Sequence, residues 1–330
     1  MGAVLMKYRQ LGKTGLMVSP ICLGTTPFGK NVDRDLAFWQ LDAFTERGAN
    51  FIDTARVYGI PATGEKALSE KIIGEWLKRS GKRDMVIIMT KGAHQPHEDM
   101  NISRCSPENI EADIEESLQA LGIERIDLYL LHRDNQAVPV GPLLEALEKA
   151  RLGGKIGHCG FSNWVLSRAR EAEGYALKAG IEGFTCNQVM WSLADINAGN
   201  MPDKTMVPMD RDTYKWHCDS GCALVAYSST AKGFFSKLAK GQDIPEKLTN
   251  LYDNETNKKI FLRLKEAARD LNLSVHDLSL AYMRDHPFPS LPTSSFSRKE
   301  QLEEALRSCE VVLPPGLMAE FNALKGYRFE

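Results

Sequence analysis

Short apolar segments alternate with segments of helical periodicity along most of this chain. The apolar segments predict eight strands, at 20–24, 51–52, 85–90, 126–131, 156–161, 184–188, 223–227 and 289–292. The spacing of apolar residues between them predicts helices at 35–47, 64–77, 106–122, 140–151, 165–179, within 206–220, and at 256–271, 275–285 and 298–309. Most of these strands lack alternating polarity, which is typical of strands that are buried on both faces of a parallel sheet.

This series of strand–helix units predicts an α/β fold, a (β/α)8 TIM barrel. The alternative is an open doubly wound sheet, which usually carries a glycine-rich fingerprint after its first strand. The turn from Gly24 to Gly29 does not match that fingerprint, and Gly153-Gly154-x-x-Gly157 follows a helix instead of a strand. We therefore expect one barrel domain over 1–330, with an N-terminal β-hairpin at 7–19 and two long loops at the C-terminal face, at 191–207 and 234–254.

Composition excludes several classes of function. With 43% hydrophobic and 25% charged residues and a net charge of −2, the chain resembles an ordinary globular protein and gives no reason to expect nucleic acid or an anionic membrane as a partner. The N-terminus lacks a secretory pattern and no run approaches the ~20 apolar residues of a membrane span. We expect a cytoplasmic protein. Seven scattered cysteines fit a reducing compartment.

A metal site is the one other function that the cysteines suggest. Cys218-x-x-x-Cys222, with His217 beside it, is either half of a metal site or a pair of small buried thiols. No second half lies nearby and Cys222 leads into an apolar strand, so we favour the thiols and expect no metal.

Four polar residues of different chemistry are placed at or near strand ends. Asp53, Lys91 and His132 close the second, third and fourth strands, and Tyr58 follows five residues after Asp53. Each alone has a structural explanation, such as a helix cap or a core histidine. However, the C-terminal ends of the strands in a parallel barrel meet on one face, so we expect the four side chains to converge.

Together these four residues would form a general-acid site. A tyrosine has a pKa of about 10 and is a poor proton donor at neutral pH, and a nearby lysine cation lowers that pKa. A carboxylate beside the lysine keeps it charged, and a histidine opposite can hydrogen-bond a carbonyl oxygen. Such a site suits the reduction of a carbonyl to an alcohol, with Tyr58 as the proton donor. The hydride must come from a cofactor, because no side chain supplies one.

At this point the sequence resembles the aldo-keto reductase superfamily over nearly its whole length. The matching segments are Phe51-Ile52-Asp53-Thr54-Ala55-x-x-Tyr58-Gly59, Thr90-Lys91, Leu130-Leu131-His132-Arg133, Gly160-Phe161-Ser162-Asn163, Asn187-Gln188-x-x-Trp191-Ser192-Leu193, Ala226-Tyr227-Ser228-x-x-x-x-Gly233-Phe234 and Glu300-Gln301-Leu302-Glu303-Glu304. The resemblance implies a (β/α)8 barrel, nicotinamide-dependent carbonyl reduction, and a catalytic tetrad of Asp53, Tyr58, Lys91 and His132.

The resemblance also implies where the cofactor binds. It places Trp191 against the nicotinamide ring and Arg298 near an adenosine 2′-phosphate. The implied cofactor residues are Gly24, Thr25, Asp53, Ser162, Asn163, Gln188, Trp191, Ser228, Thr230, Lys232, Gly233, Ser295, Ser297, Arg298 and Gln301. NADPH is the expected cofactor. NADH is the alternative, because the segment before Arg298 and Ala305 depart from the family pattern.

The expected substrate is a small carbonyl compound. Phe28, Trp164 and Trp191 would line its pocket together with Arg133, which suits a sugar, a keto acid or an aromatic aldehyde. Phe28 and Trp164 have packing at the barrel rim as the alternative explanation. Three other activities stay open: a polyol or alcohol dehydrogenase, a non-catalytic NADPH-binding regulatory subunit, and a Schiff-base lyase that uses Lys91. We expect a monomer.

Overall fold

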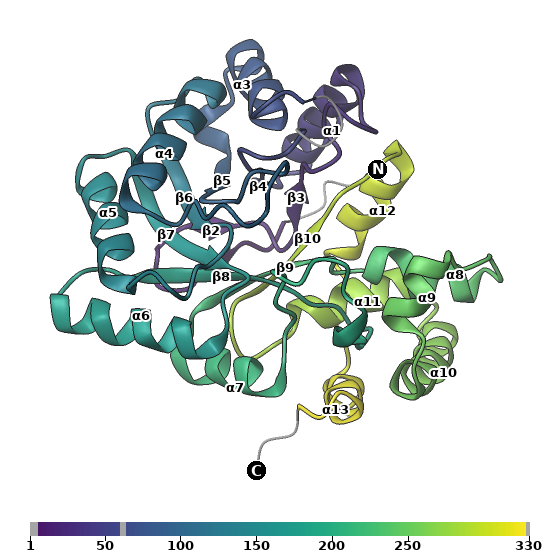
Figure 1. Ribbon diagram of the computed structural model, residues 1–330. Helices are drawn as coiled ribbons and strands as arrows, with labels where there is room; N and C mark the ends of the chain where they lie inside the picture. The colour runs from purple at the N-terminus through teal and green to yellow at the C-terminus, as the bar shows by residue number, and fades with distance from the viewer. Residues whose placement is uncertain (1–5, 60–63, 328–330) are drawn as a thin grey trace.

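Eight parallel strands close into a barrel in a computed structural model of the protein, which describes residues 6–59 and 64–327 (Figure 1). The order around the barrel is β10-β3-β4-β5-β6-β7-β8-β9. The strands are β3 (Cys22–Gly24), β4 (Phe51–Asp53), β5 (Ile87–Gly92), β6 (Ile126–Leu131), β7 (Ile156–Ser162), β8 (Phe184–Met190), β9 (Ala223–Tyr227) and β10 (Ser290–Ser294). The (β/α)8 prediction is therefore confirmed, as is the hairpin, formed by β1 (Arg9–Gln10) and β2 (Met17–Val18).

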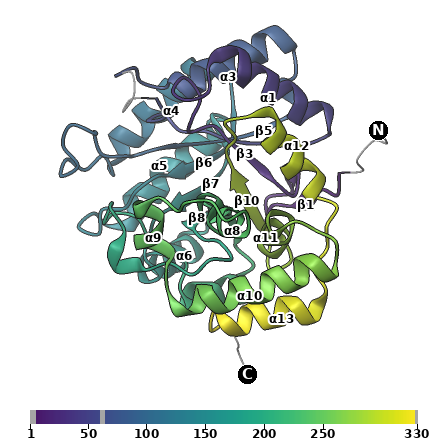
Figure 2. The same cartoon turned by 90° about the vertical axis from the view of Figure 1, so that its right-hand side faces the viewer.

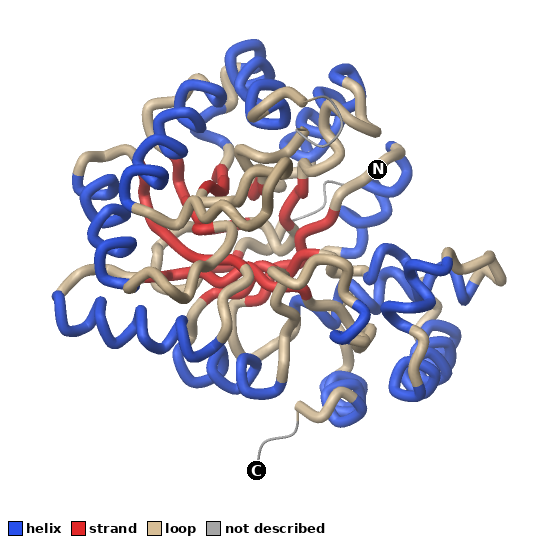
Figure 3. Tube along the Cα trace, in the orientation of Figure 1, coloured by secondary structure: helices blue, strands red, loops and turns tan. Residues whose placement is uncertain are grey.

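Helices surround the barrel on its outside (Figure 3). They are α1 (Arg34–Glu46), α3 (Leu68–Ser80), α4 (Pro107–Leu121), α5 (Val140–Leu152), α6 (Leu166–Ala179), α7 (Arg211–Ser220), α8 (Phe234–Ala239), α9 (Glu246–Tyr252), α10 (Glu255–Asp270), α11 (Val275–Arg284), α12 (Lys299–Ser308) and α13 (Pro315–Leu324). Local chemistry sets their ends. In α4, for example, the Ser106 side chain accepts a hydrogen bond from the Asn109 amide, and Gly122 ends the helix in the left-handed conformation.

Burial on both sides explains why the strands lack alternating polarity. In β6, Leu128 and Leu130 belong to the cluster inside the barrel, whereas Ile126, Tyr129 and Leu131 pack in the cluster that includes the surrounding helices. The inner cluster also takes Phe51 from β4 and Met89, Cys186, Val225 and Leu291 from four other strands. A filled interior leaves the C-terminal rim as the place where polar side chains can meet.

The C-terminal half differs from the sequence-based prediction in two ways. The segment 234–254 is not a long loop, because α8 and α9 occupy most of it. The chain also has a helix that was not predicted, α13, which lies beside α10 (Figure 2). Consecutive prolines 314 and 315 disguise its start, although proline is well suited to the first helical turn. The loop after β8 is long as expected, with a single 3-10 turn, Ala198–Asn200.

The cysteines do not form a metal site in the part of the chain that is described. His217 is buried and contacts the carbonyl oxygen of Cys222 through Nδ1, at 2.9 Å, and the side chain of Asn187 through Nε2, at 3.1 Å. All seven cysteines are free thiols, and burial raises the pKa of each one above its ordinary value.

Across residues 6–59 and 64–327, no helix combines the length and the apolar character that a membrane crossing requires.

Candidate active site

The ends of three neighbouring strands bring three of the predicted residues together. Asp53 is the last residue of β4, Lys91 lies one residue before the end of β5, and His132 follows β6 directly. Tyr58 comes from the loop after β4, where Gly59 has a φ of 105° and an added Cβ would lie only 2.6 Å from the side chain of Leu68. The loop can therefore turn back over the rim only with glycine after Tyr58.

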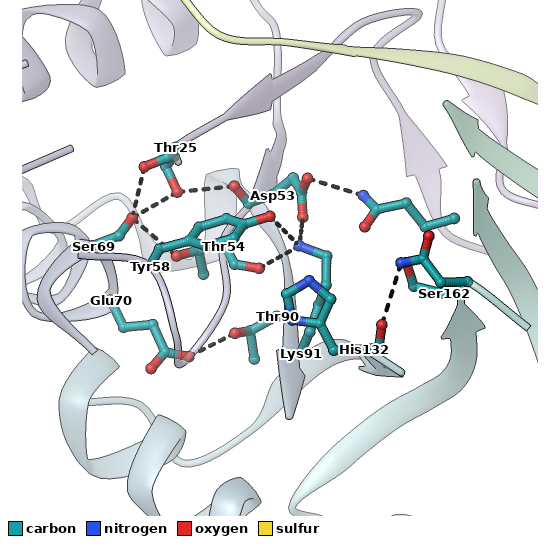
Figure 4. A network of polar contacts seen from close by, with 12 residues as sticks. Thr25, Asp53, Thr54, Tyr58, Ser69, Glu70, Thr90, Lys91, His132 and Ser162 are labelled. Atoms are coloured by element: carbon teal, nitrogen blue, oxygen red, sulfur yellow. Dashed lines mark hydrogen bonds and ion pairs between the residues drawn. The ribbon is translucent and has the colours of Figure 1, made fainter. Parts of the chain in front are cut away.

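Lys91 is the centre of this group (Figure 4). Its buried Nζ lies 2.5 Å from Asp53 Oδ1, 2.7 Å from the Thr54 carbonyl oxygen and 3.0 Å from the Tyr58 hydroxyl. Burial alone would lower the pKa of Lys91, but the Asp53 carboxylate and Tyr58 outweigh it and raise the pKa above its ordinary value. Lys91 therefore stays protonated next to the phenol.

His132 faces the same group from β6. Its ring meets that of Tyr58 edge to face, with centroids 6.1 Å apart, and its Nδ1 has no hydrogen-bond partner among the described residues. Burial, followed by the charge of Arg133, lowers the pKa of His132 well below its ordinary value. The imidazole is therefore neutral at physiological pH and can interact with a carbonyl oxygen through a hydrogen bond instead of a charge.

A cavity of about 1070 Å³ opens at this rim. Three members of the tetrad line it, Asp53, Tyr58 and His132, while Lys91 lies behind Tyr58. The other predicted residues in its wall are Arg133, Ser162, Asn163, Gln188, Ser228, Thr230, Lys232, Gly233, Ser295, Ser297, Arg298 and Gln301. The structure thus brings most of the predicted site residues to one cavity, from six of the eight barrel strands or the segments that follow them.

Two amides connect the tetrad to the opposite side of the barrel. Gln188 Nε2 donates to Asp53 Oδ2 at 2.9 Å. Asn163, in the left-handed conformation with φ 59°, donates to the carbonyl oxygen of His132 at 3.3 Å and accepts from the Tyr227 hydroxyl at 2.7 Å. Because φ is positive, the Asn163 side chain turns into the cavity wall instead of following the strand. Both amides lie where a polar ring substituent in the cavity would find donors and acceptors.

The predicted position of Trp191 is wrong. Trp191 is buried in an aromatic cluster with Tyr214, Tyr282, His286 and Phe288, and it is not part of the cavity wall. β8 ends at Met190, so Trp191 lies where the chain leaves the barrel. The strand therefore no longer sets the direction of the Trp191 side chain.

Tyr227 is the aromatic residue that lines the cavity instead. It is the last residue of β9 and pairs with Met190 of β8. The rule that identified Asp53 and His132, a polar or aromatic residue at the end of a barrel strand, also identifies Tyr227, and the prediction overlooked it.

Four other predicted residues lie outside the cavity wall. Phe28 and Trp164 are buried in the outer hydrophobic cluster, where Trp164 packs against Phe161 and Phe184, so packing at the barrel rim is the correct explanation for both. Gly24 and Thr25 are buried behind the cavity, and the Thr25 hydroxyl donates to the Asp53 carbonyl oxygen at 2.9 Å. Neighbouring side chains cover Phe28 and Trp164. Thr26 and Pro27, which follow Thr25 in the loop after β3, line the cavity.

The far end of the cavity is formed by the start of α12. Gln301 Oε1 accepts hydrogen bonds from the backbone amides of Ser297 and Arg298, at 3.0 and 3.1 Å. The Gln301 side chain thus occupies backbone amides that could otherwise bind an anion at the N-terminus of α12. Arg298 is exposed there, and Lys232, Lys237, Lys240 and Glu304 line the same part of the cavity.

These residues fit a dinucleotide cofactor. The cavity extends from the neutral His132, whose buried Nδ1 is unpaired among the described residues, to a wall with several lysines. A carboxamide would find the amides of Asn163 and Gln188, and the phosphate groups would find the loop at Ser228–Gly233 and its lysine.

The chain is similar over most of its length to several known proteins. The uncharacterized oxidoreductase YrpG of Bacillus subtilis is 28% identical over 324 residues, which cover 96% of this chain and 95% of that protein. Norsolorinic acid reductase B of Dothistroma septosporum is 27% identical over 96% of this chain and 81% of its own. Aryl-alcohol dehydrogenase [NADP(+)] of Phanerodontia chrysosporium is 27% identical over 96% of this chain and 86% of its own.

The family comparison covers nearly the whole barrel, and the relatives above are oxidoreductases. The profile of the Aldo/keto reductase family matches residues 20–325, from the start of β3 to the end of α13. Members of this family reduce carbonyl groups of small molecules and generally bind NAD(P)H. The protein is therefore an oxidoreductase enzyme that belongs to the aldo/keto reductase family.

Proposed function

We propose that the protein reduces an aldehyde or a ketone to an alcohol with NADPH, and that Tyr58 donates the proton. The single observation that carries this proposal is the 3.0 Å hydrogen bond between Lys91 Nζ and the Tyr58 hydroxyl at the wall of the cavity. When bound, the nicotinamide supplies the hydride for the carbonyl carbon. The protein supplies the proton and the place where the oxygen binds.

The proton transfer follows from the charges around Tyr58. A carbonyl oxygen between the Tyr58 hydroxyl and the neutral His132 accepts hydrogen bonds from both, which positions it for protonation. When Tyr58 gives up its proton, the Lys91 ammonium stabilises the phenolate that remains. Asp53 holds Lys91 in place and keeps it charged. Each member of the tetrad thus has a separate task.

NADPH is the cofactor that the cavity favours. Lys232, Lys237, Lys240 and Arg298 supply positive charge in its wall, and a relative of the chain is named as an NADP(+) enzyme. The cap that Gln301 forms on α12 and the negative charge of the nearby Glu304 weaken the binding of a phosphate group at the start of α12. NADH therefore stays the alternative.

Among the other activities, the oxidative direction is the strongest alternative, because one relative is named as an aryl-alcohol dehydrogenase. A Schiff-base lyase requires a free lysine amine, whereas Lys91 is protonated and contacts three oxygen atoms. A non-catalytic regulatory subunit would not need a complete tetrad. The monomeric state and the cytoplasmic location stay predictions.

Turnover of the Tyr58→Phe variant tests the proposal. With NADPH and an aromatic aldehyde, kcat should fall by about 10²- to 10⁴-fold, because the general acid is lost. The dissociation constant of NADPH should stay unchanged. Tyr175→Phe is the matched control, since Tyr175 is a partly buried tyrosine that contacts Glu145, outside the cavity. Equal turnover of Tyr58→Phe and wild type would contradict the assignment of the proton donor.

A further inference from the structure

Arg133 lines the end of the cavity formed by Tyr58, His132, Asn163, Met206 and Tyr227, which we call the substrate end. Its side chain is only 8% exposed. A buried arginine in a carbonyl-binding site would ordinarily indicate a carboxylated substrate such as a keto acid, because its planar guanidinium binds carboxylates in a bidentate way. The contacts of Arg133 point to a different role.

Three N–H groups of Arg133 are bound by the protein itself. Nε donates to the Thr205 hydroxyl at 2.8 Å, Nη1 to the carbonyl oxygen of His132 at 2.9 Å, and Nη2 to Asp203 Oδ2 at 3.1 Å. These contacts connect the residue after the catalytic histidine to the long loop that follows β8. Arg133 therefore fastens this loop across the substrate end.

Asp203 is held in place to neutralise that charge. Its Oδ1 accepts hydrogen bonds from the hydroxyl and the backbone amide of Thr205, at 2.6 and 2.9 Å. Burial raises the pKa of Asp203, but the hydrogen bonds from Thr205 and the charge of Arg133 lower it by more, so the pKa lies below its ordinary value. Asp203 is therefore a carboxylate at neutral pH, and it already neutralises the guanidinium that a substrate carboxylate would need.

The remaining groups around Arg133 add no charge. Burial and the charge of Arg133 lower the pKa of His94, whose ring lies 4.8 Å from that of His132, to about 4, so His94 is neutral. Lys91 is paired with Asp53. Each buried cation at the substrate end thus has its own carboxylate. The lysines in the cavity wall come from other loops, such as Lys232 after β9, and Lys30 is exposed to solvent, which screens its charge.

We propose that this enzyme selects uncharged carbonyl compounds over carboxylated ones, and that the Arg133–Asp203 pair determines this selection. This inference rests on the proposed function and names its substrate class. A carboxylate that enters the substrate end meets a neutral pair instead of a free guanidinium, and it loses its hydration without a compensating partner. An ester or an unsubstituted aromatic aldehyde does not lose such hydration.

A pair of substrates that differ only in charge tests the inference. Wild type and Asp203→Asn are compared with methyl 4-formylbenzoate and 4-formylbenzoate, with NADPH as the reductant. Wild type should prefer the ester. The variant frees Arg133, so the ratio of kcat/KM for the ester to that for the carboxylate should fall on the order of tenfold, the effect expected for one hydrogen bond to a charged group.

The controls separate charge from folding and from the proposed function. Asp212→Asn removes an equal charge from an exposed position outside the cavity and should leave the ratio unchanged. Asp203→Glu keeps the charge and should retain the preference. If Asp203→Asn is unfolded by circular dichroism, Asp203→Ser removes the charge and keeps a hydroxyl for the Thr205 turn.

Binding without turnover gives a second, independent measurement. The dissociation constants of benzamide and benzoate are measured by calorimetry in the presence of NADPH. Tighter binding of benzamide by wild type, lost in the charge-removing variant, supports the inference even if no aldehyde is reduced, in which case the proposed function alone fails. A wild-type preference for the carboxylate, or a ratio that does not respond to Asp203, would overturn the inference while carbonyl reduction stands.

Discussion

Two histidines of this protein have similar electrostatics and different surroundings. Burial lowers the pKa of His132 well below its ordinary value and that of His286 to about 3. His132 lines the cavity beside Tyr58. His286 is enclosed by aromatic rings, 4.6 Å from the ring of Trp191 and stacked on Phe288, and its Nδ1 lies 3.0 Å from the Tyr214 hydroxyl. A lowered pKa therefore marks burial, and only access to a cavity with other polar groups marks the functional histidine.

Replacing each histidine by glutamine gives the largest expected contrast. His132→Gln should lower kcat/KM by about 10²- to 10³-fold, because a hydrogen-bonding group at the carbonyl oxygen is misplaced. Its unfolding midpoint in urea should change little. His286→Gln should lower the free energy of unfolding by about 1–3 kcal/mol and leave kcat/KM within a factor of two, since the cluster loses packing and a buried hydrogen bond. Loss of activity in both variants would show that the aromatic cluster supports the active site directly.

The pH dependence of stability tests the lowered pKa of His286. Since the pKa of His286 is about 3 when folded and about 6.5 when unfolded, the unfolded state binds one more proton between these values. This contribution to the free energy of unfolding is complete above the unfolded pKa and is lost as the pH falls toward 3, by about 1.4 kcal/mol per pH unit.

The variant His286→Phe removes that contribution. Its destabilisation relative to wild type should be largest near neutral pH and should shrink as the pH falls from about 6.5. Urea unfolding at several pH values measures the difference. The comparison of variant with wild type also cancels the contribution of Glu70, because both proteins contain it. Burial raises the pKa of Glu70 to about 7, so its contribution to the free energy of unfolding has the opposite sign in this range. Parallel curves for the two proteins would contradict the assignment of a neutral buried histidine.

The smallest expected effect concerns Tyr227, which lines the cavity, and Trp191, which does not. Tyr227→Leu should weaken NADPH binding by about 5- to 10-fold, because it removes an aromatic surface from the cavity wall. Tyr227→Phe keeps the ring and should lose less. Trp191→Phe should change the affinity by less than a factor of two, since Trp191 faces the aromatic cluster. Calorimetric titration measures all three, and weaker binding by the Trp191 variant alone would show that Trp191, and not Tyr227, contacts the cofactor.

The sequence predicts those features that depend on periodicity and on the geometry of a barrel. Asp53, Lys91 and His132 are found because parallel strands end on one face, and a strand end is visible in the sequence. The direction of a side chain after the strand has ended is not visible in the same way. Trp191 follows β8 by one residue, and tertiary packing with Tyr214 and His286 decides where it points.

Pairing between distant charges is also outside the reach of sequence patterns. Arg133 is correctly predicted to line the cavity, but its partner Asp203 is 70 residues away in a loop without periodicity. The sequence predicts a loop where the short helices α8 and α9 lie, because 6 and 7 residues are too few for a clear helical period.

The free thiols of the protein have a consequence for the proposed reduction of aldehydes. Unsaturated aldehydes alkylate proteins mainly at cysteine, and the attacking species is the thiolate. All seven cysteines have pKa values that burial raises, and Cys22 and Cys186 lie inside the barrel. Very little thiolate is therefore present at neutral pH. Under the proposed function, the protein is therefore chemically protected against its own class of substrate.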